Sequence, residues 1–301
     1  MDIDAAINAL KLKVGDSTYS MYGSRNFSDG TCDCSGAVYY GLRKGGGSNF
    51  GYIPSTETLH TYLLQNGYSL KAENTVFDMV KGDVIIWGKK GYSAGENGHT
   101  GIAIDDQRWL ECTAWHDLGE TIQFHQHRWE MNGKPYYYVY TYTGRAPVVP
   151  GPDVNITYGL HVKGGSWLDP VVNFNKVDSN GYAGLPNHEH DMLYARVSHG
   201  TLKYRVHTLN SGWLSWVSNG NPNDTVNSCA GVFGETIDGV QMVYLTPSGE
   251  YYKNAYYRSQ TTKRSDWLPE VGDDSDYAGI YGEPLDRLQA QINMRDPFFE
   301  E

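Results

Sequence analysis

Residues 33–40, Asp33-Cys34-Ser35-Gly36-Ala37-Val38-Tyr39-Tyr40, place a cysteine at the first turn of a helix that we expect over 35–42. The free amides and the dipole at a helix start favour the thiolate form of a cysteine. The small residues Ser35 and Gly36 leave room for a substrate chain, and we assign Ser35 to substrate binding. Cys34 is therefore the candidate nucleophile.

A nucleophilic cysteine needs a base within reach, and the sequence offers His99. His99 lies in Asn97-Gly98-His99-Thr100-Gly101-Ile102, at the start of a predicted strand over 100–104. Glu111 lies in the next predicted strand, over 108–112. If the two strands form a hairpin, Glu111 sits beside His99 and orients its ring, which completes a catalytic triad. Taken singly, each of these residues could instead be interpreted as an ordinary packing or loop residue.

The order of expected elements indicates an α+β N-terminal domain with helices packed on an antiparallel sheet. Apolar residues at helical spacing predict a helix at the start of the chain, and a third helix, after the one over 35–42, is expected from Ser55 or Thr56 to Gln65. Strands are then expected over 83–87, 100–104, 108–112 and 136–142.

Three prolines and a glycine between Pro147 and Pro152 predict a stiff, extended linker. We accordingly expect a catalytic domain over 1–145, a linker over 146–153, a second domain over 154–295 and an acidic tail over 296–301.

The second domain contains three copies of one pattern, about fifty residues each, which predicts an all-β fold with three internal repeats. Each copy has a Trp-Leu-x-x-Val segment and a later Ala-Gly pair; the pairs are Ala183-Gly184, Ala230-Gly231 and Ala278-Gly279. Packing about a pseudo-threefold axis would give a trefoil- or prism-like body, and the alternative is a two-sheet sandwich.

Composition excludes several classes of protein. The 301 residues carry a net charge of −11, which disfavours nucleic-acid binding. No apolar run is long enough for a membrane span. The acidic start Met1-Asp2-Ile3-Asp4 has no features of a secretory signal peptide.

The four cysteines are too sparse for a disulfide scaffold and suit a reducing cytosol. Cys32 is the alternative nucleophile, although it lacks the Ser-Gly that follows Cys34. A zinc site from the cysteines and His99, and calcium binding at Asp273-Asp274-Ser275-Asp276, are weaker alternatives because their spacings are atypical. We therefore expect no metal and no cofactor.

Three motifs in order resemble the NlpC-type papain-like cysteine peptidases, and more narrowly the Pal-type phage peptidoglycan hydrolases (endolysins). They are residues 33–40, Gly82-Asp83-Val84-Ile85-Ile86-Trp87-Gly88, and Gly98-His99-Thr100-Gly101-Ile102. The resemblance implies a papain-like fold, with Cys34 as nucleophile and His99 as general base. Its third polar position falls on Glu111, where the family often has His or Asn. It also matches Tyr22 to a tyrosine near the nucleophile, and we assign Tyr22 and Trp87 to substrate binding.

The repeats over 155–292 are similar to the target-recognition domain of zoocin A, which implies a cell-wall-binding module. Together the two resemblances imply a bacteriophage endolysin made in the host cytoplasm and released through a holin pore. It would cleave an amide bond of Gram-positive peptidoglycan, as an N-acetylmuramoyl-L-alanine amidase or a D-Gln–L-Lys endopeptidase. The alternatives are a wall- or glycan-binding lectin with an inactive first domain, and a cellular or toxin-like cysteine peptidase.

Overall fold

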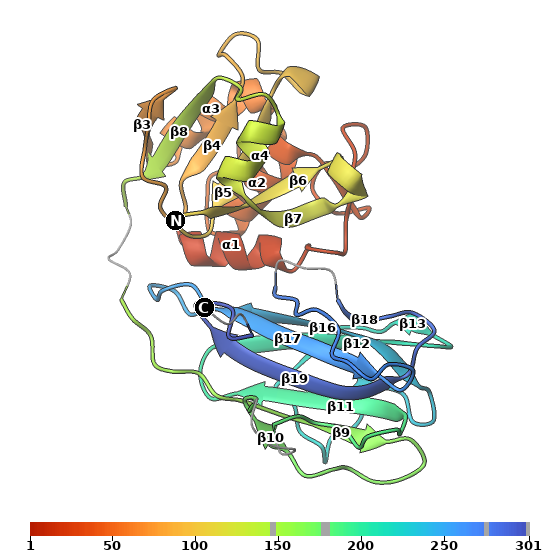
Figure 1. Cartoon of the computed structure of the whole chain (residues 1–301). Helices are drawn as coiled ribbons and strands as arrows, with labels where there is room; N and C mark the ends of the chain where they lie inside the picture. The colour runs from red at the N-terminus through yellow and green to blue at the C-terminus, as the bar shows by residue number, and fades with distance from the viewer. Residues whose placement is uncertain (145–148, 176–180, 274–276, 299–301) are drawn as a thin grey trace. The chain divides into compact units, whose positions relative to one another are not determined.

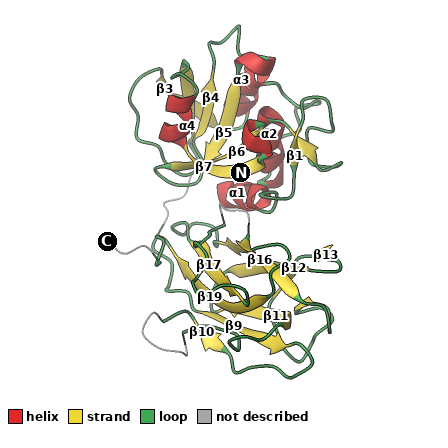
Figure 2. Cartoon of the chain, turned by 45° about the vertical axis from the view of Figure 1, so that its right-hand side comes forward, coloured by secondary structure: helices red, strands yellow, loops and turns green. Residues whose placement is uncertain are grey.

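The computed structural model of the chain describes residues 1–144, 149–175, 181–273 and 277–298 (Figures 1 and 2). The chain divides into two compact units, Met1–Val149 and Pro150–Glu301. Residues 146–148 of the expected linker and 299–301 of the expected acidic tail lie outside the described residues. Within the described ranges, no helix is long and apolar enough to cross a membrane.

The N-terminal unit is built on a six-stranded antiparallel sheet in the order β3-β8-β4-β5-β6-β7. The strands of this unit are β1 (Thr18–Tyr19), β2 (Thr31–Cys32), β3 (Tyr68–Glu73), β4 (Val84–Trp87), β5 (His99–Ala103), β6 (Arg108–Thr113), β7 (Gly119–Phe124) and β8 (Tyr137–Tyr142). The helices are α1 (Ile3–Lys11), α2 (Cys34–Lys44), α3 (Thr56–Gln65) and α4 (His125–Met131).

Helices α1, α2 and α3 lie on one side of this sheet and α4 lies on the other (Figure 2). The unit is thus α+β, as expected, but the order differs from helices followed by a simple strand meander. Helix α4 follows β7, and β8 returns to pair between β3 and β4. Neither β3, β7 nor α4 was expected from the apolar pattern.

Local sequence explains where the two site-bearing helices begin. Asp33 caps α2, because its carboxylate accepts a hydrogen bond from the Gly36 amide at 2.7 Å. Helix α3 begins with a capping box, in which Ser55 and Thr58 each satisfy the other's backbone amide. The start of each helix is therefore set by hydrogen bonds between residues that are three positions apart in the sequence.

The C-terminal unit is all β. Its strands are β9 (Ile156–Val162), β10 (Val171–Val172), β11 (His190–Val197), β12 (Thr201–Thr208), β13 (Gly212–Trp213), β14 (Val217–Ser218), β15 (Ala230–Gly231), β16 (Ile237–Leu245), β17 (Asn254–Thr261), β18 (Ala278–Gly279) and β19 (Leu285–Asn293). The long strands form three antiparallel pairs, β9–β11, β12–β16 and β17–β19, one in each sequence repeat. In the described part of this unit the strands pair into three sheets, rather than the two of a sandwich.

The Ala-Gly segment of each repeat pairs with the long strand of another repeat. Strand β15 of the second repeat pairs with β11 of the first, and β18 of the third pairs with β16 of the second. Ala183 of the first repeat pairs with Leu288 in β19 of the third, which closes the circle.

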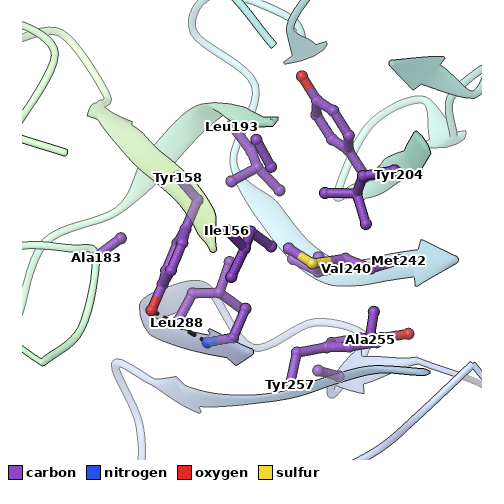
Figure 3. Close-up of a cluster of buried hydrophobic side chains, with 14 of the residues drawn as sticks. Ile156, Tyr158, Ala183, Leu193, Tyr204, Val240, Met242, Ala255, Tyr257 and Leu288 are labelled. Atoms are coloured by element: carbon purple, nitrogen blue, oxygen red, sulfur yellow. Dashed lines mark hydrogen bonds between the residues drawn. The ribbon is translucent and has the colours of Figure 1, made fainter. Parts of the chain in front are cut away.

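The three hairpins share one core, and apolar residues from each of them meet in it (Figure 3). Tyr158 from the first repeat is buried there, and its hydroxyl accepts a hydrogen bond from the Ala290 amide in the third repeat at 3.1 Å. The core therefore depends on contacts between repeats as much as within them.

Candidate active site

Cys34 is the first residue of α2, and its side chain is almost completely buried. Its Sγ atom lies 3.8 Å from the hydroxyl of Thr56, the first residue of α3. Among the described residues, the Cys34 N–H has no hydrogen-bond acceptor, because the Asp33 carboxylate accepts from the Gly36 amide instead. The Cys34 amide therefore remains available to a ligand beside the sulfur.

The residues after Cys34 pack against the loop that carries Arg25. A Cβ atom at position 36 would lie 2.1 Å from the Arg25 carbonyl oxygen, so only glycine fits. Ser35 is 2% exposed, and its hydroxyl accepts a hydrogen bond from the Arg25 guanidinium at 3.2 Å. Ser35 and Gly36 thus hold a loop in place, and the space we expected them to leave for substrate is filled.

His99 and Glu111 come together because β5 and β6 form an antiparallel hairpin with Gly101 opposite Glu111. The Nε2 atom of His99 and Oε2 of Glu111 form a short hydrogen bond. Cys34 also interacts electrostatically with His99 and favours its charged form. The structure therefore brings all three residues of the expected triad together, with a hydrogen bond between His99 and Glu111 and an electrostatic interaction between His99 and Cys34.

The electrostatics of this chain favour a charged imidazole. Burial disfavours the imidazolium of His99, but the Glu111 carboxylate and the neighbouring Cys34 outweigh it and raise the pKa of His99 to about 10. The pKa of Glu111 is lowered: its own burial opposes ionisation, but His99 and Arg128 stabilise the carboxylate. His99 and Glu111 are therefore a charged pair at neutral pH.

Arg128 is a site residue that the sequence did not reveal. It lies on α4, and its Nε donates to Glu111 Oε1 at 2.6 Å, with both side chains at most 4% exposed. Its guanidinium also stacks on Trp115 at 4.4 Å from the ring centroid. Glu111 is consequently held between two cations, His99 and Arg128.

Aromatic rings fix the plane of His99. The Trp87 ring centroid lies 5.3 Å from that of His99, and the Trp109 ring packs edge-on at 5.6 Å. Trp87 is 3% exposed, and its indole N–H donates to His125. Trp87 is therefore buried and packs against the His99 ring, whereas we expected it to contact substrate.

Of two nearby tyrosines, Tyr19 rather than Tyr22 is paired with the strand that leads into Cys34. Tyr22 is 94% exposed on its loop. Tyr19 pairs with Cys32 through the short parallel strands β1 and β2. Burial, followed by an electrostatic interaction with Cys34, raises the pKa of Tyr19 above its ordinary range. A two-residue strand gives no periodic signal, so the sequence could not identify this tyrosine.

The other cysteines are buried and bonded to backbone. Cys32 donates to the Arg25 carbonyl at 3.2 Å, and Cys112 donates to the Cys32 carbonyl at 3.3 Å. Across the β6–β7 pair, Cys112 faces Glu120, which is completely buried. Both carboxylate oxygens of Glu120 lack a hydrogen-bond partner among the described residues, and burial together with the Glu111 charge raises its pKa well above the usual range. Burial and the nearby Glu111 carboxylate therefore disfavour the ionised form of Glu120.

Two metal-site alternatives can be compared with the structure. Among the residues it describes, no three His, Cys, Asp or Glu side chains are placed to share a metal ion. Of the suggested calcium segment, residues 274–276 lie outside the described residues. Asp273 accepts hydrogen bonds from the backbone amides of Tyr244 and Ala255, which gives it a structural role.

Comparison with known proteins bears on the unit that carries this site. Residues 2–148 match the sequence model of the family described as "Bacteriophage peptidoglycan hydrolase". A lysin of Pneumococcus phage Dp-1 is 41% identical over 145 residues, which are 48% of this chain and 47% of that protein. The chain thus spans about half the length of this relative.

Similar solved structures include the Tae3–Tai3 type VI effector–immunity complex from Ralstonia pickettii and Ly7917. The first is 21% identical and covers 46% of this chain and 98% of that chain, with a TM-score of 0.29. The second is 14% identical and covers 79% of this chain and all of that chain, with a TM-score of 0.32. At these TM-scores neither likeness carries an argument. By sequence, residues 2–148, which include Cys34, His99 and Glu111, match the bacteriophage peptidoglycan hydrolase family.

Proposed function

We propose that the chain is a phage endolysin whose N-terminal unit hydrolyses an amide bond of Gram-positive peptidoglycan with Cys34, His99 and Glu111. The observation that carries this proposal is the grouping of Cys34, His99 and Glu111, in which His99 is hydrogen-bonded to Glu111 and interacts electrostatically with Cys34. A nucleophile, a base and a group that orients the base are the parts that covalent acyl transfer needs.

The reaction follows from these positions. The Cys34 thiolate adds to the amide carbonyl, and the Cys34 N–H at the start of α2 stabilises the oxyanion. His99, held as imidazolium by Glu111, protonates the leaving amine, and a thioester forms on Cys34. The neutral imidazole then takes a proton from water, whose oxygen attacks the thioester and releases the acid.

Glu111 acts in this reaction as a positioning residue. Its two oxygens are occupied by different partners, Oε2 by His99 and Oε1 by Arg128. Because Arg128 stabilises the carboxylate independently of His99, Glu111 stays ionised when His99 loses its proton. The papain-like assignment of the fold belongs to this proposal, since it rests on the order of the three sequence motifs and on the cysteine at a helix start.

The test is mass spectrometry of purified Gram-positive peptidoglycan after digestion, with the Cys34→Ala variant as control. Stem peptides with a free L-Ala amino terminus identify an N-acetylmuramoyl-L-alanine amidase. New Lys amino termini, with muropeptides trimmed to the dipeptide, identify a D-Gln–L-Lys endopeptidase. If Cys34→Ala gives the same products as the parent, Cys34 is not the nucleophile and the proposed mechanism is wrong. If several wall types yield no product with the parent, the proposal is wrong and an inactive binding protein becomes the better hypothesis.

We further propose that the C-terminal unit, 154–295, binds the cell wall and delivers the catalytic unit to it. Support comes from its acidic, aromatic-rich repeats and from its separation as a compact unit. A tethered binding unit raises the local concentration of a hydrolase at its insoluble substrate.

A further inference from the structure

The three repeats of the C-terminal unit each carry an aspartate at a β-bulge, and these aspartates link the repeats into a ring. One oxygen of Asp191 accepts a hydrogen bond from the Gly234 amide of the next repeat at 2.8 Å. Asp238 accepts from the Gly282 amide at 2.8 Å, and Asp286 accepts from the Asn187 amide. Because all three repeats keep this contact, the aspartate is part of the fold.

In two of the three repeats the same aspartate also holds a histidine. The Nδ1 atom of His161 lies 2.6 Å from Asp191, and that of His207 lies 2.5 Å from Asp238. The pairing register places Gln260 at the equivalent position of the third repeat, where its amide instead donates to the Arg264 carbonyl of its own turn. Histidine is therefore not required for the strand to fold.

At each of these two histidines, the following repeat places a partly exposed aromatic ring against the imidazole. Phe233 directly precedes the Gly234 that binds Asp191, and its ring meets His161 edge-on at 5.1 Å. Tyr281 directly precedes Gly282, and its ring centroid lies 4.3 Å from that of His207. Phe233 is 58% exposed and Tyr281 is 50% exposed, so neither ring is part of the buried core.

At the junction between the third repeat and the first, Gln260 and Pro186 take the places of the histidine and the aromatic residue. The residue equivalent to Phe233 and Tyr281 is Pro186, which precedes Asn187, just as Gln260 replaces the histidine. The tryptophan is retained in all three repeats, as Trp167, Trp213 and Trp267. Histidine and exposed aromatic ring thus occur as a unit, over a scaffold that folds without either.

From this pattern we propose that the C-terminal unit has two equivalent saccharide-binding sites, one at His161 and Phe233 and the other at His207 and Tyr281. The inference rests on the proposed wall-binding role of this unit, and it names the ligand class and the residues. Each site combines a partly exposed aromatic ring, a tryptophan packed edge-on against the histidine, and an imidazole whose ring is oriented by a buried aspartate.

The chemistry of the sites favours a sugar over a cationic peptide. Asp191 and Asp238 are each 1% exposed, and each already binds a histidine and a backbone amide, so neither carboxylate is free to take a ligand's ammonium group. An aromatic face suits the apolar C–H face of a pyranose ring. Nδ1 of both imidazoles binds the aspartate, and Nε2 has no hydrogen-bond partner in the described part of the chain, which suits a sugar hydroxyl.

The experiment measures sedimentation of the full chain with purified Gram-positive walls, in a Cys34→Ala background so that the walls stay intact. One variant combines His161→Gln with Phe233→Ala, a second combines His207→Gln with Tyr281→Ala, and a third carries all four changes. Glutamine is chosen because the third repeat folds with Gln260 at this position. The matched control is Gln260→Ala with Pro186→Ala, and Tyr281→Phe is the conservative control, since Phe233 is its natural equivalent.

Each two-residue variant should weaken wall binding by about tenfold, and the four-residue variant by about a hundredfold or more, because two linked sites bind with avidity. Both controls should bind within about twofold of the parent. Thermal unfolding of every variant is measured alongside, and a weakened variant counts only if its unfolding temperature matches that of the parent. Single changes His207→Gln and His161→Gln provide the comparison if the larger variants unfold.

Two kinds of wall identify the source of the sugar. Loss of binding to both native walls and walls stripped of polysaccharide by hydrofluoric acid points to the glycan strand, whereas loss on native walls alone points to a wall polysaccharide. A folded four-residue variant that binds like the parent overturns the two-site inference but leaves the wall-binding role intact. A parent chain that binds neither wall overturns both.

Discussion

Replacing Glu111 with glutamine tests the central contact of the site. Glutamine keeps the shape of the side chain and removes its charge, so His99 loses its counter-ion and Arg128 is left buried without one. Breaking a buried ion pair on one side costs about 3–5 kcal/mol. In a unit of this size, about 1 kcal/mol lowers the unfolding temperature by roughly 2–4 °C. We therefore expect Glu111→Gln to unfold roughly 6–20 °C below the parent at pH 7.

The pH dependence gives a sharper test than stability alone. The pKa of His99 is raised above its unfolded value of 6.5 to about 10, so its charge stabilises the fold fully below pH 6.5. That contribution is lost as the pH rises through about 10. In Glu111→Gln, burial acts with less opposition, and the pKa of His99 must fall. The alkaline limb of kcat/KM should move to lower pH, with a loss of activity at pH 7 of about 100-fold or more.

The measurements are calorimetric unfolding from pH 5 to 10, wall-clearing rates over the same range, and the pH profile of Cys34 alkylation read by peptide mass spectrometry. The matched control is Glu130→Gln on α4, which removes an exposed carboxylate that lies 3.7 Å from Lys134. An exposed pair of this kind is worth less than about 1 kcal/mol. If Glu111→Gln keeps the parent's pH profiles, the His99–Glu111 pairing described here is wrong.

Three further changes have definite expected outcomes. Glu120→Gln should leave the unfolding temperature nearly unchanged at pH 4 and raise it at pH 8, because the raised pKa of Glu120 makes folding of the parent less favourable as the pH rises above the unfolded value; an equal effect at both pH values would contradict the raised pKa. Gly101→Ala should destabilise the chain by about 1–3 kcal/mol in urea unfolding, because its Cβ would lie 2.6 Å from the Trp109 ring. Gly133→Ala, where no atom lies within 4 Å of the added Cβ, should cost about 1 kcal/mol from its positive φ and is the comparison. The truncated chain 1–149 should lose sedimentation with walls and still cleave soluble peptidoglycan fragments, and undiminished sedimentation would refute the role given to the second unit.

The part of the site that follows local sequence rules was predictable. Asp33 caps the helix that begins at Cys34, and the hairpin places Glu111 beside His99. Capping and two-residue alternation are properties of neighbouring residues, so they can be seen in the sequence.

The part that depends on distant contacts was not predictable. Arg128 reaches Glu111 from a seven-residue helix, which is too short to show an apolar period. Trp87 and Ser35 were assigned to substrate because small or aromatic residues flank the motifs, but long-range packing on the Arg25 loop and on His125 buries them. The three sequence repeats were visible, whereas the order in which they join was set by pairings up to about a hundred residues apart.

The ring of repeats has a consequence for how this unit can change. In a linear array each repeat contacts only its neighbours, so repeats can be gained or lost at the ends. Here the third repeat pairs with the first, because Ala183 pairs with Leu288 and the Asn187 amide donates to Asp286. Within the part of the unit that the structure describes, the array of repeats therefore has no free end. Removal of any repeat would leave two unmatched edges. The repeat number is accordingly locked at three, and variation in what the unit recognises must come from substitutions within the ring, such as the one that separates Gln260 from His161 and His207.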